Sequence, residues 1–224
     1  MRLVGDATAA TVAEFCSGAA AGARHGAYVT VSTGIGMGLV VDGRLVAGLD
    51  DQAGELGHIP VRPGGAPCGC GQRGCLEAYA SGRGLADRAR DACREGARSS
   101  LRALEPERIS ARDVVAAARR EDDLAMGLVD DAVELLAGAL ATLVRLLAPQ
   151  VLVLGGGVLG SSGLMDPVRE RVVALLEPNA AGLRERIRPA VHGELSALRG
   201  AAAICRADEA AVALMGGGAE RLAA

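Results

Sequence analysis

Short apolar runs separated by turn residues predict a small antiparallel sheet near the start of the chain. Residues 27–32 (AYVTVS) form one run, and residues 39–41 and 44–47 form two more. An Asp-Gly pair at 42–43 joins the second and third runs, and such a pair between apolar segments is a strong hairpin signal. Residues 27–47 are therefore expected to form an antiparallel meander.

Helical periodicity, in which apolar residues recur every three or four positions, covers most of the remaining chain. It predicts helices over residues 7–22, 76–80, 84–95, 121–148, 167–176 and 201–214, and one that begins at Ser110. Two more strands are expected at 151–154 and 187–192, and three glycines follow the first of them. A meander, then helices, then a strand, a glycine turn and a helix indicate a mixed α/β domain.

The length fits one large domain, or one and a half smaller ones, with a core of small apolar side chains. Of the 224 residues 50% are hydrophobic, yet the chain has two Tyr, one Phe and no Trp. All 24 basic residues are arginines and the formal net charge is −3, which favours neither a nucleic-acid partner nor a membrane surface. The sequence shows no signal peptide and no membrane span, so a cytoplasmic protein is expected.

A cluster of cysteines predicts a metal site. Three of the six cysteines lie within eight residues, in the segment HIPVRPGGAPCGCGQRGC. His58, Cys68, Cys70 and Cys75 would complete the tetrahedral shell of three thiolates and one imidazole that zinc prefers. Because such a shell leaves no position for water, the zinc ion would be structural. The alternative is a set of free cysteines in a turn.

A glycine-rich run follows the first predicted strand. Residues 33–38 (TGIGMG) are expected to form a turn in which Gly34, Gly36 and Gly38 expose backbone N–H groups. Such groups can cradle phosphate oxygens, and Thr33 adds a hydroxyl donor. No GK[ST] follows, so the run is not a Walker loop, and taken alone it fits a plain strand connection better.

Three carboxylates lie close to these motifs. Glu55 comes three residues before His58, and Glu77 two residues after Cys75, so a zinc clip would bring both near one place. Carboxylates are good acceptors for sugar hydroxyls, and His58 could bind zinc through one ring nitrogen and substrate through the other. Asp6 is either a helix cap or a group that orients a hydroxyl attacking ATP. Alone, each Glu fits a surface charge or a helix cap better than a sugar contact.

These motifs resemble, in their order, those of the ROK family (repressor, open reading frame, kinase). GELGH at 54–58 and CGCGQRGCLE at 68–77, followed by AYASG, are similar to the family's zinc and sugar loop, here residues 54–77. STGIGMG at 32–38 resembles its second phosphate motif, and VLVLGGGV at 151–158 resembles its adenosine-side strand and glycine turn.

The resemblance implies an actin-like, ribonuclease-H-like fold in which ATP and Mg²⁺ bind between two lobes. Residues 1–224 would form the larger, C-terminal lobe of such a protein. The implied roles are a catalytic base at Asp6; sugar contacts from Glu55, His58 and Glu77; zinc ligands at His58, Cys68, Cys70 and Cys75; phosphate contacts at Thr33, Gly34, Gly36 and Gly38; and nucleoside contacts at Gly156 and Gly157. A homodimer is implied as well.

The chain departs from the family pattern in two ways. The family has Asn directly before the catalytic Asp and again two residues after it, where this chain has Gly5 and Thr8. Loss of the first Asn would weaken sugar binding by about 1–3 kcal/mol. Family members also carry an N-terminal lobe with a phosphate loop, which is expected to be absent because only five residues precede Asp6. A cleft with one wall would not exclude water.

The expected function is ATP-dependent phosphorylation of a hexose or an N-acetylated hexosamine, impaired if the chain is truncated. The expected partners are the sugar and ATP, without nucleic acid or membrane. Two alternatives stay open. The chain could be the sugar-binding effector domain of a ROK repressor, a class that adds an N-terminal helix-turn-helix, or it could be a non-catalytic remnant.

Overall fold

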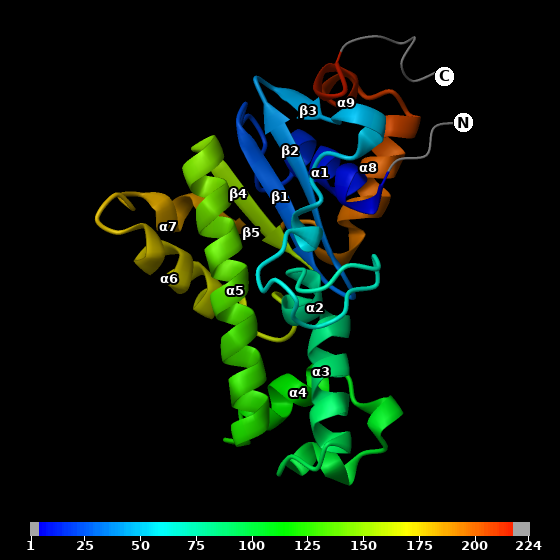
Figure 1. The fold of residues 1–224 in the computed structure, drawn as a ribbon. Coiled ribbons are helices and arrows are strands. Elements are labelled where there is room, and N and C mark those ends of the chain that lie inside the picture. The colour runs from blue at the N-terminus through cyan, green and yellow to red at the C-terminus, as the bar shows by residue number, and fades with distance from the viewer. Residues whose placement is uncertain (1–4, 217–224) are drawn as a thin grey trace.

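The computed structural model describes residues 5–216. They form a five-stranded sheet with the strand order β3-β2-β1-β4-β5 (Figure 1). The strands are β1 (Gly26–Val31), β2 (Ile35–Val41), β3 (Arg44–Val46), β4 (Val151–Gly155) and β5 (Ile187–Pro189). β1, β2 and β3 pair in antiparallel fashion, whereas β4 lies parallel to β1 and β5 parallel to β4. The predicted meander is confirmed, as part of a larger mixed sheet.

Helices lie on both faces of this sheet. They are α1 (Asp6–Ser17), α2 (Glu77–Ala80), α3 (Gly82–Arg94), α4 (Ala111–Ala118), α5 (Asp123–Leu147), α6 (Met165–Leu176), α7 (Leu183–Arg186), α8 (Ser196–Cys205) and α9 (Glu209–Leu214), with 3-10 turns at Leu49–Asp51, Leu56–His58, Ser100–Ala103, Pro106–Arg108 and Gly193–Leu195. α1, α8 and α9 cover one face, and α5 and α6 the other, with α3 and α4 beside the far half of α5 (Figure 1). The mixed α/β prediction is therefore confirmed.

Alternation along the strands separates two apolar cores. Tyr28 and Val153 point into the core under α1, α8 and α9, while Val29 and Leu154 point into the larger core under α5 and α6. Because neighbouring strand residues face opposite ways, the continuous apolar runs predict strands buried on both sides. Of the helices in the described part of the chain, none is both long enough and apolar enough to cross a membrane.

The glycine run is only partly a turn. β2 already begins at Ile35, so the turn is confined to residues 32–34, and the expected turn over 33–38 is wrong in its second half. Gly36 and Gly38 lie in β2 beneath α1, where an added Cβ would lie 2.9 Å from the Ala7 Cβ and 2.1 Å from the Thr11 Oγ1, respectively. These two glycines let α1 approach the sheet closely.

Two predicted helices have different ends in the structure. The first ends at Ser17 instead of residue 22, because the Glu14 side chain folds over Gly18, where a Cβ would lie 2.2 Å from its Oε2. The last predicted helix begins earlier than expected, at Ser196, and is divided into α8 and α9 by Ala207, which has a φ of 52°. By contrast, the helix expected to begin at Ser110 is confirmed, with a full capping box between Ser110 and Asp113.

The buried carboxylate of Glu14 joins α1 to the segment before α8. Its side chain is 0% exposed. Oε2 accepts the N–H groups of Ala19 at 2.9 Å and Val191 at 3.2 Å. Oε1 accepts the His192 N–H at 3.0 Å and the Ser196 hydroxyl at 3.1 Å. Four donors satisfy a charge that would otherwise be costly to bury, so the two segments are held in one arrangement.

Candidate functional site

A cavity of about 360 Å³ lies where the start of α1 meets the β1–β2 turn, and we call it the carboxylate cavity. It is lined by Gly5, Asp6, Ala7, Thr8, Thr30, Ser32, Gly34, Ile35, Gly36, Met37, Ala53, Gly54, Glu55 and Glu77. The structure thus brings together the three carboxylates singled out in the sequence, although they come from separate segments. Both positions that depart from the family pattern, Gly5 and Thr8, also line it.

Asp6 is the first residue of α1 and not its cap. The N-cap is Gly5, and the Asp6 Oδ1 accepts the backbone N–H of Ala7 at 2.7 Å. A carboxylate in the first turn of a helix is stabilised by the helix dipole. Its other carboxylate oxygen, Oδ2, accepts no hydrogen bond within the described part of the chain, so it is available for a ligand.

Glu77 connects the carboxylate cavity with the cysteine cluster. Its Oε2 accepts the backbone N–H of Ile35 at 2.9 Å, and its Oε1 lies 3.9 Å from the Cys68 Sγ. Gly34 leaves the necessary space, since a Cβ there would lie 2.5 Å from the same Oε2. The carboxylate is therefore held at the end of the turn by the backbone of β2.

The four predicted metal ligands converge. One ligand atom from each of His58, Cys68, Cys70 and Cys75 lies within 4.8 Å of all the others. The Cys70 and Cys75 sulfurs are 3.7 Å apart, and the His58 Nδ1 is 3.7 Å from the Cys68 Sγ. A tetrahedral zinc ion with Zn–S bonds of about 2.3 Å spaces its sulfurs about 3.8 Å apart, so the donor set and spacing fit zinc.

The chemistry of the cluster also suits a cation. Burial, followed by the nearby sulfurs of Cys70 and Cys68, raises the pKa of the Cys75 thiol to about 12. A divalent cation reverses this effect, because it binds thiolates. The His58 Nε2, on the other side of the ring from the cluster, lies 3.7 Å from the Glu55 Oε2. The imidazole is thus placed between the cluster and the Glu55 carboxylate, although His58 does not itself line the carboxylate cavity.

A second set of contacts, not predicted from the sequence, anchors the cysteine loop. The Tyr79 hydroxyl accepts the Ala66 N–H at 2.7 Å. The guanidinium groups of Arg62 and Arg88 lie over the Tyr79 ring, at 5.1 Å and 4.8 Å from its centroid. Both arginines pair with Asp131 on α5. This stack ties the loop to α5 without any metal.

A larger cavity, of about 530 Å³, lies on the other side of the β1–β2 turn, and we call it the arginine cavity. Its walls are the turn, the start of α3, the start of α4 and the segment after β4. It is lined by Ser32, Thr33, Gly82, Arg83, Ala86, Arg90, Ser110, Ala111, Arg112, Gly157, Val158, Ser161 and Ser162. Three arginines and no carboxylate among these residues make it suited to an anion.

The turn itself separates the two cavities. Ser32 lines both, whereas Thr33 lines the arginine cavity and Gly34 the carboxylate cavity. Backbone bonds hold the turn against α3: the Gly82 N–H donates to the Ser32 carbonyl at 2.7 Å, and the Arg83 N–H to the Thr33 carbonyl at 3.2 Å. A group transferred between ligands in the two cavities would pass at Ser32.

The other predicted glycines occupy distinct places. Gly157 lines the arginine cavity. Gly156 lines a smaller neighbouring cavity of about 140 Å³, and its φ of 93° and the Val31 carbonyl, 2.3 Å from a built Cβ, exclude a side chain. Gly36 lines the carboxylate cavity, but Gly38 is buried under α1 and lines none of these cavities. Gly38 thus has a packing role in the structure, and the phosphate contact there stays a prediction.

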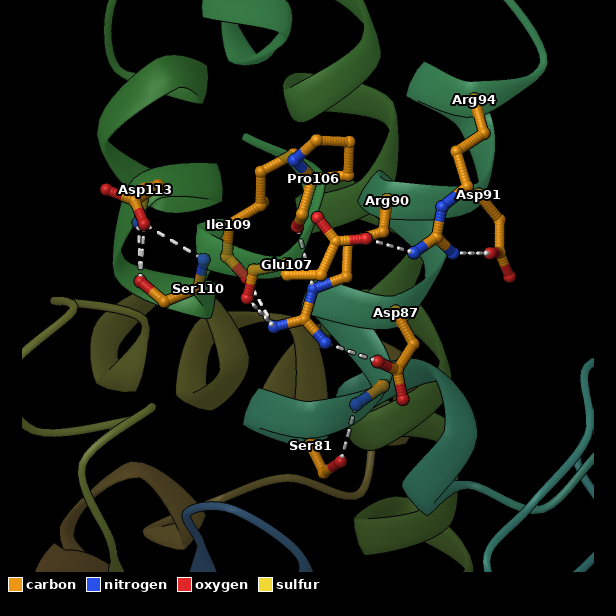
Figure 2. A network of polar contacts seen from close by, with 11 residues as sticks. Ser81, Asp87, Arg90, Asp91, Arg94, Pro106, Glu107, Ile109, Ser110 and Asp113 are labelled. Carbon is orange, nitrogen blue, oxygen red and sulfur yellow. Dashed lines mark hydrogen bonds and ion pairs between the residues drawn. The ribbon is translucent and has the colours of Figure 1, made fainter. Parts of the chain in front are cut away.

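Sequence reasoning missed Arg90, whose guanidinium holds the segment before α4 (Figure 2). Its Nε donates to the Pro106 carbonyl at 3.1 Å, and its Nη2 to the Ile109 carbonyl at 2.7 Å. Its Nη1 pairs with Asp87 one turn earlier on α3 at 2.8 Å. These bonds fix the start of α4 as a wall of the arginine cavity. Only the i, i+3 spacing from Asp87 hinted at a paired arginine.

Comparisons with a family model and with curated proteins give consistent matches. The model of the ROK family matches residues 1–208. A glucokinase of Halalkalibacterium halodurans is 39% identical over 79% of this chain and 54% of its own length. An N-acetylmannosamine kinase of Citrobacter koseri is 39% identical over 74% of this chain and 52% of its own. The chain thus spans about half the length of the curated relatives it matches.

Solved structures give the same result. A ROK family glucokinase from Streptomyces griseus, in complex with glucose and AMPPNP, is 32% identical with a TM-score of 0.75, over 92% of this chain and 68% of that one. A ROK family transcriptional regulator, a homologue of the E. coli MLC protein, is 27% identical with a TM-score of 0.74, over 94% of this chain and 52% of that one. The expected actin-like, ribonuclease-H-like fold is confirmed.

Proposed function

Because the chain belongs to the ROK family, we propose that it forms the larger, catalytic lobe of a kinase that transfers phosphate from ATP to a hexose or an N-acetylated hexosamine. One observation carries this proposal: a cavity with three carboxylates and a cavity with three arginines meet at Ser32. Carboxylates accept hydrogen bonds from sugar hydroxyls and arginines bind phosphates, and phosphoryl transfer needs the two ligands side by side.

The carboxylate cavity would bind the sugar. Glu55 and Glu77 accept hydrogen bonds from its hydroxyls, and the outer nitrogen of His58 adds a contact at the rim next to Glu55. Relatives named glucokinase and N-acetylmannosamine kinase support a hexose or its N-acetylated derivative. Glu77 is held by β2, so a sugar bound to it would be fixed relative to the turn.

The arginine cavity would bind ATP. Its phosphate chain would lie along Ser32, Thr33 and Gly34, with Gly36 following in β2, and its nucleoside would lie toward Gly157. A relative solved with glucose and AMPPNP supports this pair of ligands. When ATP binds with Mg²⁺, the ion neutralises charge that develops on the transferred phosphoryl group.

Asp6 would orient the attacking hydroxyl and take its proton. The sugar oxygen forms a bond to the γ-phosphorus, the bond from that phosphorus to the β-phosphate oxygen breaks, and ADP leaves. In such transfers positioning contributes more than proton removal. We place zinc at His58, Cys68, Cys70 and Cys75, where it would stabilise the loop that carries Glu55 and Glu77 and take no part in the reaction.

A second candidate function is a sugar-binding effector domain. It is favoured by the similarity to the ROK transcriptional regulator, which covers 94% of this chain, and by Gly5 and Thr8 at positions where the kinases' pattern has Asn. Such a domain would bind sugar in the carboxylate cavity without turning over ATP. A remnant would bind neither.

The test is a coupled assay of ADP formation with glucose, mannose, N-acetylglucosamine and N-acetylmannosamine, on protein isolated from its native cells. The intact mass of that protein is measured in parallel. Sugar-dependent turnover that Asp6→Asn abolishes while sugar binding persists supports the kinase. Sugar binding without turnover, with ATP present, contradicts the kinase and supports the effector domain. If the protein neither binds sugar nor turns over ATP, the non-catalytic remnant is the remaining alternative.

A further inference from the structure

The arginine cavity has a marked excess of positive charge. Its lining includes Arg83, Arg90 and Arg112, together with hydroxyl groups of four serines and one threonine, and no acidic side chain. The whole chain has no lysine, so a polyanionic ligand must be met by arginine or by backbone N–H groups. Guanidinium groups suit phosphate because their planar fork can donate two parallel hydrogen bonds.

One of the three arginines is already occupied. Arg90 donates to Asp87 and to the carbonyls of the segment before α4 (Figure 2). The guanidinium groups of Arg83 and Arg112, by contrast, make no hydrogen bond and no ion pair within residues 5–216. Both residues are exposed. They are therefore the two arginines of this cavity that are free to meet a ligand.

Arg83 lies beside the β1–β2 turn at one wall of the arginine cavity. Its backbone N–H bonds to the Thr33 carbonyl at 3.2 Å, so its Cα is fixed beside the turn that both cavities share. Its Nη1 lies 3.6 Å from the position of a Cβ built on Gly69, in the cysteine loop. The side chain thus extends from α3 toward the cysteine loop, so Arg83 lines both the arginine cavity and a neighbouring cavity of about 300 Å³ that Gly69 also lines.

Arg112 faces the cavity from another wall. It is the second residue of α4, whose first turn is fixed by the capping box of Ser110 and Asp113. The Arg90 bonds to Pro106 and Ile109 hold the segment that leads into this turn (Figure 2). Arg112 is therefore carried on a wall of defined position.

We infer that Arg83 and Arg112 contact the phosphate chain of the nucleotide from these two walls. This inference rests on the proposed function and names the two cationic side chains that would meet the phosphates in a chain without lysine. Removing either guanidinium should weaken ATP binding by about five- to thirtyfold, as expected for partly exposed charge-assisted bonds. Adenosine, which has no phosphate, should bind equally well to all variants.

The experiment measures equilibrium binding of ATP, ADP, AMP, adenosine and inorganic tripolyphosphate to the native protein and to Arg83→Gln and Arg112→Gln. Arg98→Gln, which removes one exposed charge outside all these cavities, is the control. Thermal unfolding checks that each variant is folded. Arg83→Lys keeps the positive charge but lacks the planar pair of donors, so it should recover part of the ATP affinity that Arg83→Gln loses.

Loss of ATP and ADP affinity with unchanged adenosine affinity supports the inference. Unchanged ATP affinity in both variants overturns it, and so does an equal loss for adenosine, which would indicate a distorted cavity. If the native protein binds tripolyphosphate through Arg83 and Arg112 but no nucleotide, the phosphate contacts stand and the ATP-dependent function falls. If it binds nucleotide equally in all variants, only the inference falls.

Discussion

The Glu77 carboxylate accepts the backbone N–H of Ile35 at 2.9 Å, and through this bond the cysteine loop is attached to the first residue of β2. The same side chain lies 3.9 Å from the Cys68 sulfur. The shape of the carboxylate cavity therefore depends on both the sheet and the cysteine cluster. A change on either side of Glu77 should alter sugar binding.

Glu77→Gln should separate the role of the Glu77 charge in sugar binding from the role of its hydrogen bond to Ile35 in stability. The amide oxygen can still accept from Ile35, so the free energy of unfolding should change by less than about 1 kcal/mol, while sugar affinity falls about tenfold or more. Glu77→Ala also leaves the Ile35 N–H without its acceptor and should cost about 1–3 kcal/mol of stability. Urea unfolding and sugar titration measure the two effects. Unchanged sugar affinity in Glu77→Gln would remove Glu77 from the sugar site.

Metal removal should open the loop that carries Glu55 and Glu77. We expect the purified protein to contain about one zinc per chain and to lose several kcal/mol of stability on chelation, because the metal's binding energy is folding energy. Cys75→Ala should do the same, while Cys205→Ser, an exposed cysteine outside the cluster, should not. The stack of Tyr79 with Arg62 and Arg88 should keep the rest of the fold intact. Metal analysis measures the zinc content, and thermal unfolding measures the stability of each variant. A zinc-free protein of unchanged stability would contradict the prediction.

Gly5→Asn should strengthen sugar binding. Gly5 has a φ of −58° and a ψ of 148°, which any residue adopts, and a Cβ would meet only the Thr8 Oγ1 at 3.7 Å. The new amide would reach the carboxylate cavity and tighten binding by about 1 kcal/mol or more, roughly fivefold. As an N-cap it should add only about a few tenths of a kcal/mol to stability. Gly5→Ala, which adds a Cβ without an amide, is the matched control, and equal effects of both changes would refute the sugar contact.

Acid should destabilise the N-terminal end of α5, where Asp122 is the N-cap. Partial burial opposes its ionisation, but bonds from the N–H groups of Ser100 and Ala125 and from the hydroxyls of Ser100 and Ser99 outweigh it and lower the pKa to about 2, from 3.8. Because the folded pKa is below the unfolded one, this stability is present above pH 4 and is lost as the pH falls toward 2. After allowance for solvent screening, we expect about 1 kcal/mol. Unfolding of Asp122→Asn between pH 2 and 5 should show a shallower slope, and a slope equal to that of the native protein would contradict the assignment.

Arg90→Gln should loosen the wall of the arginine cavity. Freed from Pro106 and Ile109, the start of α4 should move, so binding of both ATP and adenosine should weaken about tenfold while sugar binding stays the same. Arg94→Gln breaks only the outer pairs with Asp91 and Glu107 and should change neither. The loss of adenosine affinity distinguishes this positioning role from a direct phosphate contact. Equal behaviour of the two variants would argue against it.

Local patterns predicted local structure well. The four metal ligands come together because His58 and the three cysteines lie within 18 residues, and closely spaced ligands need only one loop to converge. The hairpin and the capping box at Ser110 likewise depend on neighbouring residues. The family resemblance then gave the order of these pieces in the fold.

What the sequence did not reveal depends on contacts between distant segments. Glu14 looks like a surface residue of an amphipathic helix, yet its donors come from residues 177 to 182 positions away as well as from Ala19. Gly38 looks like part of a phosphate turn, yet Thr11 of α1 occupies the space beside it. Nothing in a linear pattern says which helix will lie on which strand.

Because both cavities open at Ser32, a single molecule could fill them together. A sugar joined through one oxygen to a nucleotide's phosphate chain would bind each half in the presence of the other, at an effective concentration on the order of millimolar. Such a bisubstrate inhibitor would gain affinity because its two halves are linked across a narrow turn, without any new contact to the protein. The width of the turn at residues 32–34 thus sets the length of the linker that such an inhibitor needs.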